Sequence, residues 1–476
     1  KISPTGITLR PTMFVLFLSF VFPFMVSITA YGGAGEIGGN KFLIEDKGAR
    51  IYLDFGESFD FGEDYFYEFL QPRVDNGLEV YFEFNLMPKV KQLYGKKALR
   101  FTDVKYEKPN IDAVFISHSH SDHCGHISFL DENIPIYMGH GTFKILDTYN
   151  ALYPQLYDKV SEFKNINFFK SGDKIKIKHL IIEPIHVEHS VPGAYGFIIH
   201  TSKGPIVYTG DFRLHGPKAE MSKEFIEKAK NSKPIAMLCE GTRMGSEEQT
   251  YTEAEVETKA EKMIKEAKAM VFADFSMSNV DRVISFYNAA VKNRRKLVID
   301  TKFAFVLDNL REKIPSLPDV LTDPNIAVYY RLCKSCEFQE MDYKPWERKY
   351  FNKKITFSEI SQKPEKYVMH INFNKLMELV YLQPKGGDFI YSMSEHFLEG
   401  EGNEQEKKVL DNWLEHFGVD FKKAHCSGHA SRADLEETVR KINPEILLPI
   451  HTQASGEFKK IHKNVVELKR GITVEI

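Results

Sequence analysis

His118-Ser119-His120-Ser121-Asp122-His123 is the stretch that decides the fold of this chain, because it places three imidazoles and a carboxylate in one short loop. The apolar run at 111–116 comes just before it and predicts a buried strand that ends in the loop. In extended backbone, His118 and His120 project to the same side, whereas Asp122 and His123 face a second direction. Imidazole nitrogens and carboxylate oxygens suit zinc or a similar first-row ion. The spacing therefore predicts metal binding rather than the alternative, a polar loop whose histidines only cap a strand end.

Three further candidate ligands, His189, Asp211 and His451, follow other apolar runs downstream. Each stands where a predicted strand meets a loop, so all three can reach the same end of a sheet. His186 lies three residues before His189, and residue type alone does not separate the two as ligands. The residues alone therefore predict a metal site with more than one ion and leave one ligand open.

These motifs resemble those of the metallo-β-lactamase fold hydrolases, and the resemblance covers nearly the whole chain beyond residue 25. The motifs that carry it are HSHSDH at 118–123, the His189 segment and Tyr208-Thr209-Gly210-Asp211. Four more are similar to motifs of the β-CASP nuclease branch: Cys239-Glu240-Gly241-Thr242, Ser276-Met277-Ser278-Asn279, His425-Cys426-Ser427-Gly428-His429-Ala430 and Pro449-Ile450-His451. The resemblance implies an α/β fold, an αββα sandwich with an inserted α/β domain, in the shorter layout of archaeal-type, ribonuclease J-like members.

The resemblance also implies a two-metal site. One zinc would be held by His118, His120 and His189, the other by Asp122, His123 and His451, with Asp211 as the bridge. The motif Ser190-Val191-Pro192 selects His189 over His186, which we expect to be a supporting or core residue. Two cations about 3.5 to 4 Å apart lower the pKa of a shared water and stabilise both oxygens of an in-line phosphoryl displacement. Manganese is the alternative to zinc.

Phosphodiester hydrolysis also requires a proton for the leaving 3′ oxygen, and we assign this to Glu240 and His429, alongside Asp122 among the catalytic residues. Glu240 follows an apolar stretch at 235–238, which argues against the alternative of an ordinary surface carboxylate. The implied substrate contacts are Ser278, Asn279, His425, Ser427, Gly428 and His429. Ser278 or Asn279 is also suited to cap the helix that follows, and a capped helix start is itself an anion site. For Ser427 the alternative is helix capping alone.

The substrate implied by the resemblance is RNA. A histidine at position 451 is typical of RNA-processing members of the branch, whereas DNA-processing members usually have valine there. We therefore expect a ribonuclease, acting as a 5′-to-3′ exonuclease, with internal cleavage as a further activity. The alternatives are a DNA nuclease of the same branch, a small-ester or thioester hydrolase, and a non-enzymatic RNA-binding subunit, which would lack metal ligands.

A glycine pattern near the start imitates a dinucleotide-binding motif. Gly33-Ala34-Gly35-Glu36-Ile37-Gly38 satisfies GxGxxG, and Asp54 follows at the distance of a ribose-binding acid. That motif requires a helix between two strands. The segment 42–54 instead predicts a β-hairpin, so we expect no nicotinamide or flavin cofactor and place the glycines at the rim of the metal site.

Composition agrees with a globular enzyme. The chain has 476 residues, of which 43% are hydrophobic and 27% charged, enough for two sizeable cores. Its formal net charge of −3 excludes a uniformly basic nucleic-acid binder, so RNA binding must depend on a local groove and on the metals. The five cysteines form no disulfide framework and favour the cytoplasm. Cys333-Lys334-Ser335-Cys336 has CxxC spacing but no second pair, so we leave it outside the site.

The expected domains are 25–245 for the first part of the metallo-β-lactamase domain, 246–386 for the β-CASP domain and 387–476 for the return segment. An aromatic-rich insertion spans 58–109 and could stack on bases, form its own small core or make a dimer contact. Residues 1–24 form an apolar extension, which we place outside the fold rather than in a membrane, since 26–31 alternates like a first strand. A homo-oligomer is compatible with the sequence.

Overall fold

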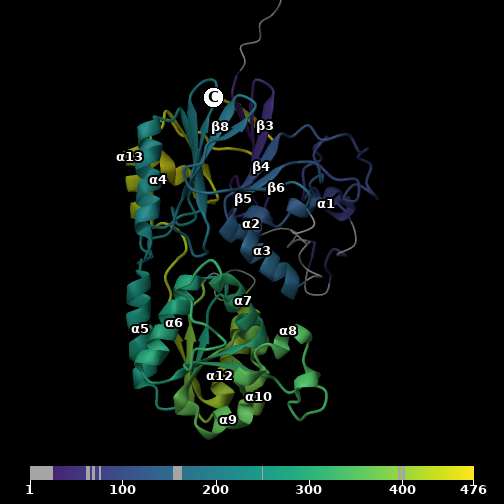
Figure 1. Ribbon diagram of the computed structural model, residues 1–476. Helices are drawn as coiled ribbons and strands as arrows, with labels where there is room; N and C mark the ends of the chain where they lie inside the picture. The colour runs from purple at the N-terminus through teal and green to yellow at the C-terminus, as the bar shows by residue number, and fades with distance from the viewer. Residues whose placement is uncertain are drawn as a thin grey trace, which may run out of the picture.

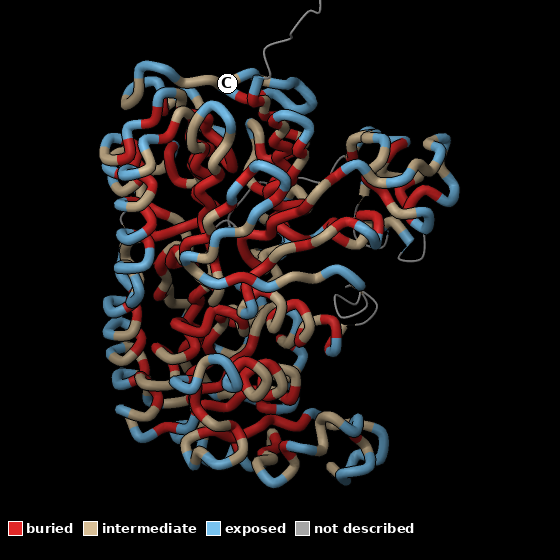
Figure 2. Tube along the Cα trace, turned by 45° about the horizontal axis from the view of Figure 1, so that its top comes forward, coloured by how far each residue is buried: buried red, intermediate tan, exposed pale blue. Residues whose placement is uncertain are grey.

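The computed structural model describes residues 25–59, 65–66, 70–73, 77–153, 163–248, 250–394, 398 and 403–476. It contains three β-sheets, two of which pack face to face while the third lies in a separate unit. Figure 1 shows the two-sheet sandwich above and the third sheet with its helices below. In Figure 2 the buried residues run through the interior of both parts, and the exposed residues lie mostly along the outside.

The first sheet has the order β20-β1-β2-β3-β4-β5-β6. Its strands are β1 (Ser27–Gly32), β2 (Lys41–Asp46), β3 (Ala49–Leu53), β4 (Ala113–Ile116), β5 (Ile136–Gly139), β6 (Ile166–Phe169) and β20 (Thr473–Glu475). β1, β2 and β3 are antiparallel neighbours, whereas β3 to β6 are parallel. The predicted hairpin after the glycine loop is therefore confirmed, and no helix separates β2 from β3.

The second sheet has the order β19-β11-β10-β9-β8-β7. Its strands are β7 (Ile175–Ile177), β8 (Leu180–His186), β9 (Tyr195–His200), β10 (Pro205–Tyr208), β11 (Ala236–Glu240) and β19 (Ile446–Ile450). β10, β11 and β19 are parallel neighbours, so their carboxyl ends meet at one edge of the sheet. Asp211 and His451 follow β10 and β19, and Glu240 is the last residue of β11, so the topology brings the three side chains together.

Four layers make up the sandwich. The inner faces of the two sheets share one core, in which Phe42, Phe115 and Phe197 are fully buried. Helices α1 (Glu79–Glu83), α2 (Ser121–Cys124) and α3 (His140–Leu152) lie on the side of the first sheet, and α4 (Ala219–Ser232) and α13 (Arg432–Ile442) on the side of the second. The predicted αββα sandwich is confirmed. Burial of apolar side chains on both faces of each sheet provides its main stabilisation.

The third sheet is wholly parallel, with the order β15-β14-β13-β16-β12-β17-β18. Its strands are β12 (Met270–Asp274), β13 (Lys296–Asp300), β14 (Ile326–Tyr329), β15 (Lys354–Ile355), β16 (Tyr367–His370), β17 (Gly387–Tyr391) and β18 (Val419–Lys423). The helices around it are α5 (Glu253–Glu266), α6 (Val280–Lys292), α7 (Thr301–Arg311), α8 (Pro345–Arg348), α9 (Phe357–Gln362), α10 (Glu378–Leu382) and α12 (Glu404–Phe417). We call the part from α5 to β18 the inserted unit, and its presence confirms the predicted inserted α/β fold.

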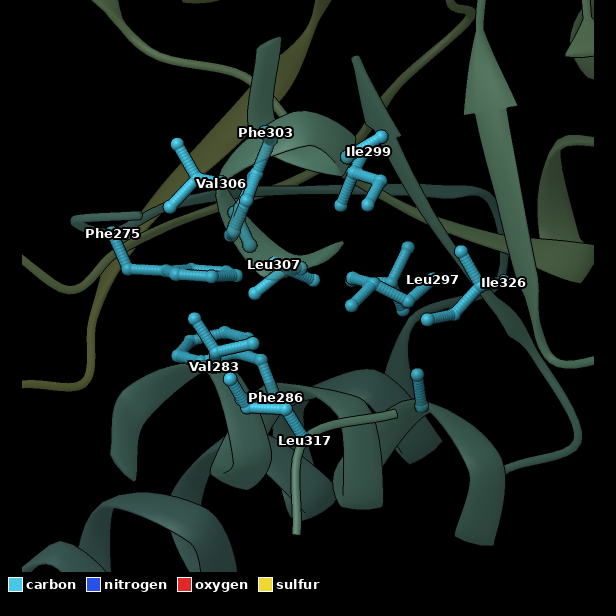
Figure 3. Packing of buried hydrophobic residues seen from close by; sticks show 14 of the residues in the cluster. Phe275, Val283, Phe286, Leu297, Ile299, Phe303, Val306, Leu307, Leu317 and Ile326 are labelled. Carbon is cyan, nitrogen blue, oxygen red and sulfur yellow. The ribbon is translucent and has the colours of Figure 1, made fainter. Parts of the chain in front are cut away.

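The inserted unit has a core on each face of its sheet. Figure 3 shows one of them, where Phe275 and Phe286 lie face to face below Phe303, with ring centroids of the first two 4.7 Å apart. Apolar residues on both faces of a parallel sheet explain why its strands form continuous apolar runs in the sequence.

The expected start of the return segment at 387 is wrong. β17 and β18 pair in parallel with β12 and with each other, so they extend the sheet of the inserted unit. The chain returns to the sandwich only after Lys423. A short apolar run is compatible with a strand in either sheet, and only tertiary pairing decides which sheet it joins.

Part of the aromatic-rich insertion packs on the sandwich. Among its described residues, Phe82 and Tyr94 are buried against the outer side of the first sheet, whereas Phe101 is 64% exposed. The predicted extension at 1–24 lies outside the described residues. Within the part of the chain that the structure describes, no helix has the length and apolar character needed to cross a membrane.

Candidate metal centre

The carboxyl ends of strands from both sheets bring seven predicted ligands together. They fall into two groups that share one residue: His118, His120, His189 and Asp211 in the first, and Asp122, His123, Asp211 and His451 in the second. Within each group, one ligand atom from every residue lies within 4.8 Å of the others. Asp211 belongs to both groups, in the position predicted for a bridging carboxylate.

In the first group, three imidazole nitrogens converge. His120 Nδ1 lies 3.0 Å from His118 Nε2 and 3.1 Å from His189 Nε2. Burial lowers the pKa of all three, for His120 to about 4, and the neighbouring imidazoles lower the pKa of His118 and His189 further. Neutral imidazoles with lone pairs aimed at one point are the form in which histidine binds a metal.

In the second group, carboxylates and imidazoles alternate. Asp122 Oδ2 lies 2.8 Å from His451 Nε2, and Asp211 Oδ2 lies 3.1 Å from His123 Nε2. Burial raises the pKa of Asp122 and Asp211, but His123 and His451 more than compensate and hold it well below its usual range. Conversely, burial lowers the pKa of His123, and Asp211 with Asp122 raises it well above its usual value. These ionised carboxylates attract positive charge to a fully buried site.

The side chains fit two divalent ions. Asp211 Oδ1 is buried and has no hydrogen-bond partner among the described residues, so one acceptor of the shared carboxylate is left for a cation. Mixed nitrogen and oxygen ligands suit zinc and other first-row ions. The ligand set is complete by residue type in both groups.

Asp54 orients one of these ligands, and sequence reasoning missed this role. It follows β3 in left-handed backbone at a φ of 57°, and it is fully buried. Its carboxylate accepts hydrogen bonds from the Ser117 backbone N–H at 2.6 Å and from Tyr208 Oη, and it lies 2.7 Å from His123 Nδ1. A carboxylate behind a ligating imidazole fixes its tautomer and orientation. The only sequence signal was its place directly after a buried strand, which many acidic residues share.

Glu240 and His429 lie beside the two ligand groups. Glu240 ends β11 with no exposed surface, and its Oε1 lies 3.6 Å from His429 Nδ1. Burial lowers the pKa of His429, but the carboxylates of Glu240 and Asp211 raise it above its usual value. The two carboxylates thus favour the protonated imidazole, the form that can donate a proton.

Thr242 links this pair to a metal ligand. Its Oγ1 donates to Glu240 Oε2 at 2.9 Å and lies 3.1 Å from His429 Nδ1 and 2.8 Å from His451 Nδ1. In the sequence, Thr242 was only the last residue of the motif Cys239-Glu240-Gly241-Thr242, and nothing indicated a role of its own. A hydroxyl can bridge several groups because it both donates and accepts, but which groups it reaches depends on tertiary contacts.

Two of the predicted substrate residues sit at the start of α6. Ser278 and Asn279 are 8% and 9% exposed, and Asn279 Oδ1 accepts the Arg282 backbone N–H at 3.1 Å. The predicted helix cap is confirmed. The loop 425–429 holds the other four, and within it Ser427 Oγ accepts the His429 backbone N–H at 3.1 Å. His425 is turned inward, where its Nδ1 lies 3.1 Å from the Ser392 carbonyl oxygen.

Two other histidines near the site, His186 and His215, lie outside the two ligand groups. His186 stacks on the Tyr195 ring with centroids 4.2 Å apart. His215 Nε2 donates to the Ser427 carbonyl at 2.8 Å, so it supports the loop 425–429. The glycine loop does border the metal centre, because the His451 backbone N–H donates to the Gly33 carbonyl at 2.8 Å. All five cysteines are free.

Residues 87–266 match the family model described as a beta-lactamase superfamily domain. The chain is 22% identical over 470 residues to ribonuclease J 2 of Streptococcus pyogenes serotype M3, covering 94% of this chain and 75% of that protein. It is 24% identical over 361 residues to ribonuclease J of Sinorhizobium meliloti, covering 73% and 59%. It is 25% identical over 457 residues to ribonuclease J of Mycoplasma pneumoniae, covering 92% and 70%.

The matched part of this chain thus spans 59% to 75% of the length of these three relatives. Among solved structures, one titled as a protein of unknown function from Enterococcus faecalis V583 is similar, with a TM-score of 0.75 and 23% identity. The similarity covers 95% of this chain and all of that one, and at this identity it shows the fold alone.

Proposed function

Because this chain belongs to the metallo-β-lactamase superfamily, in the β-CASP branch with the ribonuclease J proteins, we propose that it is a metal-dependent ribonuclease that hydrolyses RNA phosphodiester bonds. The single observation that carries the proposal is the joint geometry of two complete ligand groups and the Glu240–His429 pair. The 3′ alkoxide that leaves a phosphodiester is strongly basic and needs a proton donor, whereas the thiolate that leaves a thioester does not.

Each residue of the site has a role in this reaction. Two divalent ions, which we propose are zinc with manganese as the alternative, would lower the pKa of water and stabilise negative charge on the phosphate when bound. Asp211 would contact both, and Asp54 holds His123 in position. Glu240 faces His429 Nδ1 at 3.6 Å and favours the protonated imidazole, so the proton for the leaving oxygen would come from Nε2.

The substrate would pass between the sandwich and the inserted unit. Asn279 caps α6, and the amides at the start of a capped helix attract a phosphate group. We propose RNA rather than DNA because position 451 holds histidine, and a 5′-to-3′ direction by similarity to ribonuclease J.

We also propose that 25–245 is the first part of the sandwich domain and that the protein acts in the cytoplasm.

The proposal is tested with 5′-labelled RNA that carries either a monophosphate or a triphosphate, in zinc and in manganese. Wild type should release labelled mononucleotide from the RNA and leave a matched DNA untouched. The His120→Ala variant should lose at least one metal ion and nearly all cleavage, because three nitrogens converge at His120. If wild type leaves the RNA intact in both metals, the ribonuclease proposal is wrong. If it cleaves the DNA equally well, the substrate is either nucleic acid rather than RNA alone.

A further inference from the structure

Two fully buried arginines lie where the sandwich and the inserted unit meet. Arg213 follows Asp211 by two residues, and Arg282 lies in the first turn of α6. Neither side chain has any exposed surface. A buried guanidinium persists only when charged partners and hydrogen-bond acceptors surround it, so the partners of each arginine show what it holds.

Arg213 connects the sandwich to both helices at the start of the inserted unit. Its guanidinium lies 3.1 Å from the Asp281 carboxylate on α6, 3.3 Å from Glu188 and 3.7 Å from Glu253 on α5. Glu188 immediately precedes the ligand His189. Arg213 therefore ties two segments that carry metal ligands to the first turns of α5 and α6.

Arg282 connects the inserted unit to the returning chain. It makes a bidentate pair with Glu253, at 2.8 Å and 3.2 Å. Burial raises the pKa of Glu253, but Arg282 and Arg213 outweigh this effect and lower the pKa to about 2. Its other donors reach the Ser392 carbonyl at 2.6 Å and the Cys426 carbonyl at 3.2 Å. The guanidinium thus fixes the backbone at the start of the loop 425–429.

That loop carries the candidate proton donor. Two residues after Cys426, the Gly428 carbonyl accepts a hydrogen bond from His189 Nδ1 at 2.6 Å, and His429 then faces Glu240. Arg213 Nη1 also points to the Ser427 carbonyl, at 3.5 Å. Both arginines therefore hold backbone carbonyls of the segment that positions His429.

We propose that Arg213, Arg282, Glu253 and Asp281 form a positioning network that places the loop 425–429, and with it His429, against the metal centre. This inference rests on the proposed function, since it assigns these residues to the placement of its proton donor. The network also links the turn at Asn279, a proposed substrate contact, to the pair of Glu240 and His429, because Asn279 caps the same turn of α6 that carries Arg282.

A positioning role accounts for the network better than a purely stabilising role does. Buried ion pairs often add little net stability, because desolvation offsets their attraction, and apolar residues of similar volume would pack at least as well. An arginine fork, in contrast, fixes several acceptors in one plane. The arrangement is thus suited to set geometry, and an error of about 1 Å in a catalytic group can cost about 100-fold in rate.

The test compares four variants of the full-length, metal-loaded protein. Arg282→Lys keeps the charge but loses the fork, and Glu253→Gln removes the bidentate partner. Asp281→Asn weakens the contact with Arg213, together with a partly exposed pair that Asp281 makes with Lys218 at 3.0 Å. The control is Glu257→Gln, which breaks an exposed α5–α6 ion pair with Lys292 that lies outside the network. For each variant we measure metal content, kcat and KM on 5′-monophosphate RNA, and hydrogen exchange along the chain.

The three network variants should retain both metals and a KM within about threefold, while kcat falls by roughly 10- to 100-fold. Hydrogen exchange should rise at least about tenfold in peptides covering 425–430 and stay unchanged in β9, with no change anywhere in the control. Folded, metal-loaded Arg282→Lys and Asp281→Asn proteins with wild-type kcat and wild-type exchange at 425–430 would overturn the inference. Loosening spread over the whole chain would also overturn it, in favour of a purely stabilising role. If wild type cleaves no RNA, the exchange pattern still decides the positioning role by itself.

Discussion

His189 Nδ1 donates a hydrogen bond to the Gly428 carbonyl oxygen at 2.6 Å, although 239 positions separate the two residues. The bond leaves His189 Nε2 free to face the first ligand group, where it lies 3.1 Å from His120 Nδ1. It also ties the loop 425–429 to a metal ligand. The orientation of one imidazole thus depends on a backbone group that the chain supplies only after the whole inserted unit.

Gly428→Ala should lower cleavage without unfolding the protein. A Cβ at this position would lie 2.8 Å from Ser190 Oγ and 3.2 Å from His189 Cε1, so the loop must move away from the metal ligand. We expect a roughly 10-fold fall in kcat/KM, measured on labelled RNA. The control is Gly456→Ala, where an added Cβ meets nothing within 4 Å. Equal activity of both variants would contradict a tight loop.

Asp54→Asn should weaken metal binding at the second ligand group. An asparagine cannot replace both oxygens that receive Ser117, Tyr208 and His123, so the imidazole loses its fixed orientation. Loss of such a partner costs about 10- to 100-fold in metal affinity. Metal titration followed by cleavage at saturating metal should show a raised Kd and substantial recovery of activity.

A matched control for this prediction exists in the same sandwich. Asp46 is also buried and accepts hydrogen bonds from Ser202, and it lies 2.8 Å from His179 Nε2, but none of these residues belongs to a ligand group. Asp46→Asn should leave metal affinity unchanged. If both variants lose metal equally, the effect of Asp54→Asn is one of stability.

Thr242→Val should slow cleavage, whereas Thr242→Ser should leave the rate close to that of wild type. Valine keeps the shape of threonine but removes the hydroxyl that joins Glu240, His429 and His451. We expect kcat to fall by about 10- to 100-fold with both metals retained, because the proton donor loses its alignment. Serine retains the hydroxyl and should stay within about threefold of wild type in single-turnover assays. Equal rates for the valine and serine variants would remove Thr242 from the site.

Asp274→Asn should make the inserted unit more stable at high pH and little different at low pH. Burial raises the pKa of the Asp274 carboxyl group from 3.8 to about 7, against the opposing charge of Lys375. The folded protein thus binds this proton more tightly than the unfolded chain. The free energy of unfolding therefore falls as pH rises from about 4 to about 7, by about 4 kcal/mol at most.

Urea unfolding at pH 5 and pH 8 tests this prediction. At pH 5 the protonated carboxyl group resembles an amide, and the two proteins should unfold at similar urea concentrations. At pH 8 wild type carries a buried charge that the variant lacks, so the variant should unfold at the higher concentration. A difference independent of pH would contradict a pKa of about 7 for Asp274, because its carboxyl group would then not titrate between the two pH values.

Much of the metal centre could be predicted without coordinates. The ligands lie in short motifs at the ends of apolar runs, and strands that end in polar residues indicate a site at a sheet edge. Asp54 and Thr242 show the limit of this reasoning, since an acidic residue and a hydroxyl are common everywhere and only their neighbours make them part of the site. The error at residue 387 has the same origin, because apolar β17 fits either sheet until its pairing with β12 is known.

The sequence by itself determined the types of the candidate ligands and the α/β pattern of the inserted unit, because both depend on local pattern and residue chemistry. The αββα sandwich followed from the motifs that resemble a nuclease branch. Tertiary structure alone decided that Arg213 and Arg282 share Glu253, that His189 bonds to Gly428 and that His429 faces Glu240. These contacts join segments far apart in the chain. Their geometry follows from how two packed units meet, and burial there makes each unpaired charge costly, so no local pattern encodes it.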